Sequence, residues 1–216
     1  MHKMNKKITG AAVITLSAVM LSACGSPEGN IQNHWSEAAG AEEEFPEKDK
    51  KLTQLAKEEQ NVFENLTSYE NEEQKKIKSS IEKAVSSVKE RKELMEEEKE
   101  EINKAYDEAM EAGEPINNLE NEKMTKKAQQ AQRAMEKRNE AFNSVHGAYT
   151  EAADKEIEMY ESFTDENLEL ESLEKHLDKI NSSYKKVESF RDSFNTETKS
   201  FNEAKNVFGE MVEAES

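Results

Sequence analysis

The side chain with the clearest covalent chemistry in this sequence is Cys24, the single cysteine among 216 residues. A lone thiol cannot form an internal disulfide or a metal site built from several cysteines. Three lysines (Lys3, Lys6 and Lys7) precede a charge-free apolar stretch, residues 8–21, which leads to small residues just before the cysteine. This order is typical of a secretory signal peptide, and the stretch is shorter than the ~20 apolar residues of a membrane-spanning helix.

The end of this segment, Leu21-Ser22-Ala23-Cys24, resembles the lipobox of bacterial lipoproteins. In that pattern Leu21, Ser22 and Ala23 are recognised by the signal peptidase, cleavage falls after Ala23, and Cys24 is acylated on its thiol. The resemblance implies that residues 1–23 are a lipoprotein signal peptide. It also implies that the protein is anchored by lipid on the extracytoplasmic face of the cell membrane. The alternative, an ordinary secretory signal, leaves the only thiol unexplained.

Three arginines interrupt apolar series later in the chain, and they are the next candidates for a site. Arg91, Arg138 and Arg191 occupy positions where the spacing predicts an apolar side chain, and Glu98 and Glu156 occupy similar positions. One interpretation is a buried polar layer that sets the register of the helices. The other is a binding site for an anionic ligand, to which the guanidinium fork donates hydrogen bonds. We favour the layer, and both remain open.

Histidines, glycines and acidic residues form no recognisable catalytic or metal-binding pattern. None of the four histidines has a second His or Cys at ligand spacing, and the glycines form no phosphate-binding loop. Glutamates on a solvated helix lack the sheltered cleft that acid–base catalysis requires. Acidic runs at 42–44 and 96–98 are interpreted as solvated faces or weak cation ligands. We predict no catalytic residue, no cofactor and no metal, and therefore no enzyme.

The elements that position these residues are predicted to be long helices. Charged residues make up 36% of the chain and hydrophobic residues 34%, a balance shared by disordered chains and by helices with a narrow apolar stripe. Only seven glycines and three prolines occur, which favours helices. Apolar positions recur in alternating steps of four and three, the coiled-coil signature, over residues 77–112, 128–163 and 170–212.

These three series predict an all-α fold, an elongated antiparallel coiled-coil bundle of three long helices within residues 46–216. Gly113-Glu114-Pro115 is predicted to end the first helix. Asn117 or Asn118 is expected to cap the second helix, and Thr164 or Asp165 the third.

The segment before the bundle is harder to interpret. Residues 24–45, which include Trp35, contain few apolar side chains and are predicted to be the lipidated cysteine and a flexible tether. Residues 46–66 keep an apolar stripe that is out of phase with Ile77. They form either a short extra N-terminal helix or the start of one staggered helix, and we favour the staggered helix. The positions that define this stripe are Leu52, Leu55, Val62 and Leu66.

A lipobox followed by an acidic helical body resembles the cell-wall-binding lipoproteins of low-GC Gram-positive bacteria, the YkyA-like family. The C-terminal stretch shows the likeness best, in Ile180-Asn181-x-x-Tyr184-x-x-Val187 and Phe194-Asn195-x-x-Thr198-x-x-Phe201-Asn202. The resemblance covers nearly the whole chain. It implies an association with the cell wall and supplies no catalytic residues.

The net charge limits the possible partners. Residues 1–23 contain three lysines and no acid, so removing their three positive charges from the formal charge of −17 leaves −20. Such a body is repelled by nucleic acid, teichoic acids and anionic lipids within a Debye length of ~8 Å. Wall contact would therefore use peptidoglycan, bridging cations or a basic patch such as Lys123-x-x-Lys126-Lys127.

We accordingly predict a non-catalytic binding or scaffold lipoprotein at the interface of membrane and cell wall. Its partners would be the membrane, through the lipid anchor, and a cell-wall polymer or an envelope protein, with no nucleic acid. The alternative is an accessory or regulatory lipoprotein that presents a helical face to an exported enzyme or to secretion machinery.

Overall fold

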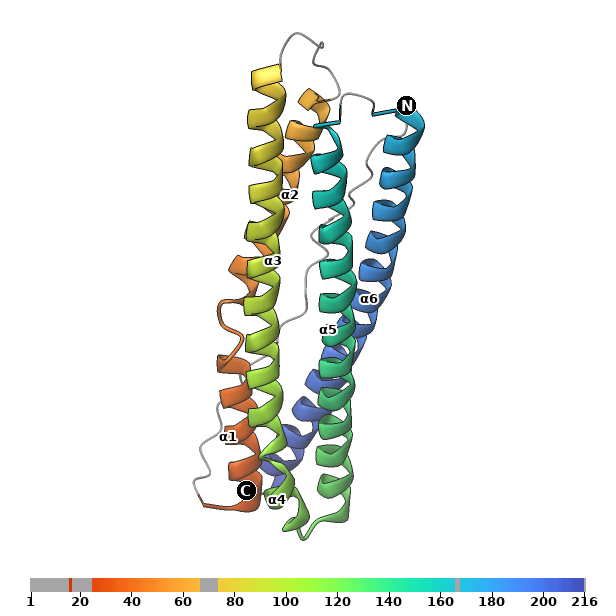
Figure 1. Ribbon diagram of the computed structural model, residues 1–216. Coiled ribbons are helices and arrows are strands. Elements are labelled where there is room, and N and C mark those ends of the chain that lie inside the picture. The colour runs from red at the N-terminus through yellow and green to blue at the C-terminus, as the bar shows by residue number, and fades with distance from the viewer. Residues whose placement is uncertain (1–15, 17–24, 67–73, 166–167, 216) are drawn as a thin grey trace. The chain divides into compact units, whose positions relative to one another are not determined.

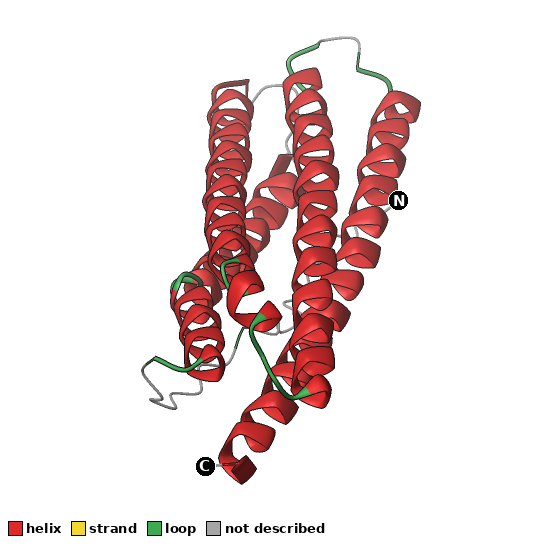
Figure 2. Ribbon diagram, turned by 90° about the horizontal axis from the view of Figure 1, so that it is seen from below, coloured by secondary structure: helices red, strands yellow, loops and turns green. Residues whose placement is uncertain are grey.

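The computed structural model describes residues 16, 25–66, 74–165 and 168–215, and every regular element among them is a helix (Figures 1 and 2). The all-α prediction is confirmed. The predicted signal peptide and Cys24 lie outside the described residues, apart from Leu16. The helices are α1 (Pro27–Gly40), α2 (Phe45–Leu66), α3 (Gln74–Met110), α4 (Gly113–Asn117), α5 (Glu122–Ser162) and α6 (Leu170–Glu215).

The described chain falls into two compact units, each named here after its buried arginine. Of the described residues, the Arg91 unit contains 47–66, 74–97, 144–165 and 168–189, and the Arg138 unit contains 16, 25–46, 98–143 and 190–215. Helices α3, α5 and α6 therefore contribute one segment to each unit.

The Arg91 unit packs four helical segments, in which neighbours along the chain run antiparallel. Lys51 of α2 pairs with Glu90 of α3 at 2.7 Å, and the Ser87 hydroxyl of α3 donates to the Leu55 carbonyl at 3.4 Å. Helix α2 thus lies alongside α3, so the favoured single staggered helix is wrong. Its buried stripe is Leu52, Ala56, Glu59, Phe63 and Leu66, which packs α2 as a fourth helix where three were predicted.

In the Arg138 unit the additional helix is α1, within the segment that was predicted to be a flexible tether. Pro27 occupies the first turn, and the Ser26 hydroxyl caps the helix by accepting from the Gly29 amide at 3.1 Å. Trp35 is 1% exposed, and its ring centroid lies 5.8 Å from that of Phe201 and 5.3 Å from that of Phe208. The tether prediction is wrong because buried positions still recur in steps of four and three, the apolar Ile31, Trp35, Ala38 and Phe45 together with the acidic Glu42.

The three predicted apolar series are buried almost throughout. The exceptions are mainly at the ends, where Ile77 and Phe163 are half-buried and Leu170 is 71% exposed. The 3.5-residue spacing therefore identified the core faces of α3, α5 and α6 correctly.

The predicted caps are wrong in detail. Helix α3 ends before Gly113 as expected, but the chain then forms the short helix α4. The Asn121 side chain caps α5 by accepting from the Lys123 amide at 2.9 Å, whereas Asn117 and Asn118 lie at the end of α4. The Thr164 hydroxyl donates to the Glu161 carbonyl at 2.8 Å, so it closes α5 instead of opening α6.

Candidate functional site

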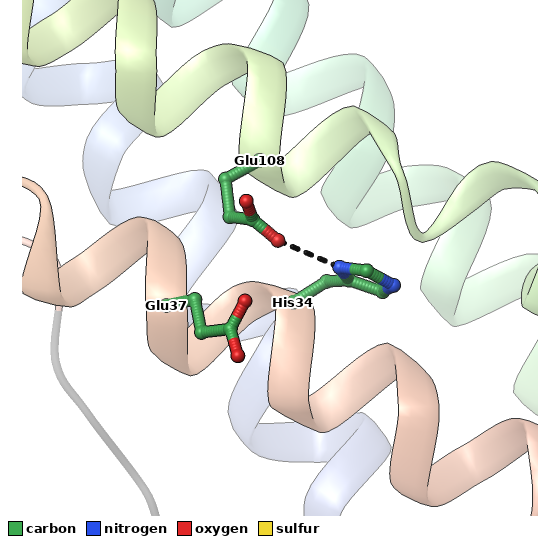
Figure 3. Close-up of side chains that lie close together, drawn as sticks. All are labelled: His34, Glu37 and Glu108. Carbon is green, nitrogen blue, oxygen red and sulfur yellow. Dashed lines mark hydrogen bonds and ion pairs between the residues drawn. The ribbon is translucent and has the colours of Figure 1, made fainter.

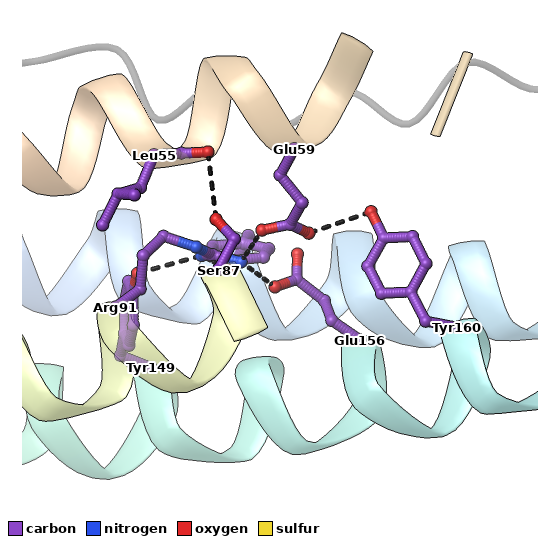
Figure 4. Close-up of polar contacts among 8 residues, drawn as sticks. Leu55, Glu59, Ser87, Arg91, Tyr149, Glu156 and Tyr160 are labelled. Carbon is purple, nitrogen blue, oxygen red and sulfur yellow. Dashed lines mark hydrogen bonds and ion pairs between the residues drawn. The ribbon is translucent and has the colours of Figure 1, made fainter. Parts of the chain in front are cut away.

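The Arg91 guanidinium lies at the centre of a buried polar cluster in the Arg91 unit (Figure 4). Nη1 donates to the hydroxyl oxygens of Tyr149 and Tyr184, each at 2.9 Å. Nη2 donates to a carboxylate oxygen of Glu59 from α2 and of Glu156 from α5. The side chains of Arg91, Glu59 and Glu156 are all 0% exposed, so one cation joins four helices out of contact with water.

The pKa values of the arginine and of the two tyrosines in this cluster are all raised. Burial alone would lower the pKa of Arg91, but Glu156, the two tyrosines and Glu59 together raise it well above its usual value. Burial raises the pKa of Tyr149 to about 12 and that of Tyr184 above its usual value. The guanidinium is therefore charged and the phenols are neutral at physiological pH.

A sixth side chain extends the cluster toward the end of α5. The Tyr160 hydroxyl donates to the other carboxylate oxygen of Glu59 at 2.9 Å (Figure 4). Burial and the nearby Glu59 raise the pKa of Tyr160 far above its usual value, so it stays a donor. Glu59 thus bridges an arginine on α3 and a tyrosine on α5.

The Arg138 unit contains a second buried cluster with a different geometry. Arg138 of α5 forms a bidentate pair with Glu42, from Nη1 to Oε1 at 2.7 Å and from Nη2 to Oε2 at 2.6 Å. Its Nε donates to the Thr198 hydroxyl at 2.8 Å, and its Cζ lies 4.5 Å from the ring centroid of Phe194, within cation–π range. One carboxylate, one hydroxyl and one ring therefore enclose this guanidinium.

Glu42 lies in the tight turn between α1 and α2, where the Phe45 amide donates to its carbonyl at 3.2 Å. Burial raises the pKa of its carboxyl, and the pairing with Arg138 opposes this shift without cancelling it. The interpretation of 42–44 as a solvated acidic run is thus wrong for Glu42, which is 2% exposed. Glu98 of the second acidic run is also 2% exposed.

The structure separates the three arginines that the sequence grouped together. Arg91 and Arg138 are buried, each in its own cluster, whereas Arg191 on α6 is half-buried and belongs to neither. Of the two predicted acids, Glu156 contacts Arg91. Sequence reasoning missed Glu59 and Glu42 as partners. The signal was present, since both occupy core positions of the four-and-three spacing in their segments.

A smaller cluster near the surface joins α1 to α3 in the Arg138 unit (Figure 3). His34 Nδ1 lies 2.7 Å from Glu108 Oε1, and Glu37 lies one turn further along α1. The hydrogen bond from His34 is the main reason that the pKa of Glu108 is lowered. These three groups could hold a metal ion, a possibility that the spacing of histidines along the sequence did not reveal. The imidazole and the Glu108 carboxylate already satisfy each other, so the cluster needs no ion to hold α1 against α3.

The described part of the protein is all-helical, and its two buried arginines are each paired with buried carboxylates. None of the described helices combines the length and the apolar composition needed to cross a bilayer. The model of the YkyA family, described as "Putative cell-wall binding lipoprotein", matches residues 26–211. The chain therefore belongs to this family of lipoproteins, as its sequence resemblance had indicated.

A curated relative agrees with this assignment. The chain is 26% identical over 190 residues to "Uncharacterized lipoprotein YkyA" of Bacillus subtilis (strain 168), with 87% of this chain and 85% of the relative covered. No solved structure matches the chain.

Proposed function

We propose that this protein is a non-catalytic binding lipoprotein that is anchored by lipid on Cys24 and contacts the cell wall from the outer face of the membrane. The observation that supports it most is the extent of the family match. The match begins at residue 26, two residues after Cys24, and runs through α1 to α6 up to residue 211. The part that the family shares is thus the whole helical body, placed directly behind the anchor.

The interior of the body supports a binding role rather than a reaction. Arg91 and Arg138 donate to carboxylates, hydroxyls and phenols that come from other helices and, in Glu42, from the turn between α1 and α2, and both are at most 1% exposed. We infer that they form a polar layer in each unit, which sets the register of the helices, and not an anion site. A ligand of the wall would then contact surface side chains.

The surface charge favours an uncharged or zwitterionic wall component. A body with a formal charge of −20 is repelled by the phosphates of teichoic acids. Lys123 and Lys126 at the start of α5 are exposed, and Lys127 is half-buried beside them, so these lysines offer a local basic contact. Peptidoglycan is the wall polymer that this charge distribution tolerates best.

Co-sedimentation of the full chain with purified walls tests the proposal. We expect retention on peptidoglycan with and without its teichoic acids, and weaker retention when Lys123, Lys126 and Lys127 are replaced by glutamine. The matched control replaces Lys175, Lys179 and Lys185, which are exposed on α6, and should leave retention unchanged. A chain that remains in the supernatant with every wall preparation would refute wall binding.

A further inference from the structure

A cavity of about 240 Å³ lies between α1 and α6 in the Arg138 unit. Helix α1 contributes Gln32 and Trp35 to its lining, and α6 contributes Lys205 and Gly209. At ~30 Å³ per water molecule, this volume equals about eight waters, which is enough for a small organic molecule. Neither arginine cluster nor the His34 cluster takes part in it.

Three polar atoms of the lining are buried without a hydrogen-bond partner among the described residues. They are the Lys205 ammonium nitrogen, the Trp35 indole nitrogen and the Gln32 amide oxygen. Lys205 and Gln32 are 7% exposed and Trp35 is 1% exposed. Buried polar groups in native proteins are nearly always paired, because each unpaired one costs free energy. Three such groups lining one cavity indicate a ligand that supplies the missing partners.

The charge state of Lys205 also indicates a ligand in this cavity. Burial alone lowers the pKa of its ammonium group to about 8, and no neighbouring carboxylate offsets that effect. The acids that line the cavity, Glu210 and Glu213, are both exposed at its edge. Lys205 is therefore still mostly protonated at pH 7, and none of the described residues forms a hydrogen bond with its ammonium nitrogen.

Gly209 keeps this space open. It lies within α6, where glycine is less favourable than alanine. A Cβ atom at this position would lie 3.7 Å from the Gln32 side-chain nitrogen, so any larger side chain would extend into the cavity.

We propose that this cavity binds a small carboxylate with an N–H donor beside it, the chemistry of an amino acid or of the carboxyl-terminal residue of a peptide. The Lys205 ammonium and the Trp35 indole N–H donate to the carboxylate, and the Gln32 amide oxygen accepts from the ligand N–H. Exposed Glu210 and Glu213 at the edge disfavour a dianion and suit an ammonium or amide group. This site goes beyond the proposed wall contact and does not depend on it.

Trp35 is the only tryptophan of the chain, so its fluorescence reports on the cavity directly. The full chain, purified with its anchor in detergent, is titrated with alanine, N-acetylalanine, alanylalanine and alaninamide. We expect a saturable change with the first three and at least tenfold weaker binding of alaninamide, which lacks the carboxylate. Tighter binding of alanine indicates a free amino acid as ligand, and tighter binding of alanylalanine indicates a peptide terminus.

Two variants remove the site in different ways. Calorimetry measures the affinity of each variant for the same ligands, independently of fluorescence. Lys205→Met removes the charge, and Gly209→Leu fills the cavity while improving helix propensity. Each should weaken binding at least tenfold at unchanged helix content. Lys199→Met, an exposed lysine on the same helix, should bind as the wild type does. Absence of saturable binding by all three carboxylates, or equal affinity in all three variants, would overturn the proposal, whatever the outcome of the wall experiment.

Discussion

At the scale of single residues, the two buried arginines differ in how their charge is balanced. Arg91 meets two carboxylates and two phenols, whereas Arg138 meets one carboxylate in a bidentate pair. The sequence predicted both arginines, because each interrupts an apolar series. Their partners Glu59 and Glu42 were missed although both occupy core positions of the four-and-three spacing, because acids are usually solvated and these two were not assigned to the core.

Removing one member of the bidentate pair should destabilise the protein more than removing both. Arg138→Met leaves the Glu42 carboxylate buried without its cation, and we expect a loss of about 3–5 kcal/mol of unfolding free energy. The double variant Glu42→Gln with Arg138→Met removes both charges and should recover most of that loss. Urea denaturation followed by circular dichroism measures the difference.

Arg133→Met is the control for this pair, since Arg133 is exposed on the same helix and its loss should stay within about 0.5 kcal/mol. A double variant that is no more stable than Arg138→Met would show that the pair does not act as a unit.

Lys205 gives a stability prediction whose size depends on pH. Its folded-state pKa of about 8 is below the ordinary 10.5, so between these values the unfolded chain binds more protons and wild-type stability rises with pH. Without ligand at pH 7, Lys205→Met should therefore be more stable by roughly 1–3 kcal/mol, because an unpaired buried charge is removed. This advantage should shrink as pH rises from 8 to above 10.5. Thermal melts of both proteins across this range, with Lys199→Met as reference, provide the measurement. A constant difference would contradict the assignment.

At the scale of elements, the spacing of apolar residues predicted the helices correctly in segments where apolar residues are frequent. It failed in segments where they are rare. The core faces of α3, α5 and α6 follow directly from their 3.5-residue repeat. Helix α1 was missed because residues 24–45 contain few apolar side chains on average. That composition obscured five core positions that follow the same repeat. Caps were also missed, because several Asn and Thr residues lie near each helix end, and only the fold decides which of them reaches an amide.

If α1 is part of the core, then truncating its largest side chain should destabilise the protein. Trp35→Ala removes a ring that packs against Phe201 and Phe208, and we expect a loss of about 3–5 kcal/mol. Asn33→Ala, exposed on the same helix, should be nearly silent. Denaturation followed by far-ultraviolet circular dichroism compares the two, and equal midpoints would mean that α1 does not pack in solution.

The assignment of the apolar stripe of α6 can be tested by introducing an aspartate at a buried position and, in a separate variant, at an exposed position. Leu177 is 3% exposed, so Leu177→Asp buries an unpaired carboxylate and should cost several kcal/mol. Ser182→Asp adds the same charge at an exposed position and should change stability by no more than about 0.5 kcal/mol. Similar melting temperatures for both variants would show that the assigned face of α6 is wrong.

At the scale of the whole molecule, the sequence predicted the family and the all-α class but not the full number of packed helices. Three clear repeats suggested a three-helix bundle. The additional helices pack through Trp35 of α1, through Glu42 in the turn that follows it, and through Glu59 of α2. The candidate ligand cavity was not predictable at all. Its lining joins residues of α1 and α6 that are far apart in sequence, and none of them forms a motif.

The anchor is tested in cells with Cys24→Ala. We expect this variant to appear in the medium or as uncleaved precursor, and to lose labelling by a fatty-acid analogue, because the acylated thiol is gone. The wild type should be labelled and remain with the membrane fraction, and Ser26→Ala, close to the cleavage site, should behave like the wild type. Labelling that persists in Cys24→Ala would disprove lipidation at this residue.

The turn at Glu42 has a consequence for how the protein acquires its structure. Glu42 meets Arg138, 96 residues later, and Glu59 meets Tyr160, 101 residues later. A chain exported from its N-terminus presents α1 and α2 first, yet their buried partners emerge only with α3 and α5. Contacts of such long range form slowly, so the segment nearest the anchor is expected to be the last to find its place.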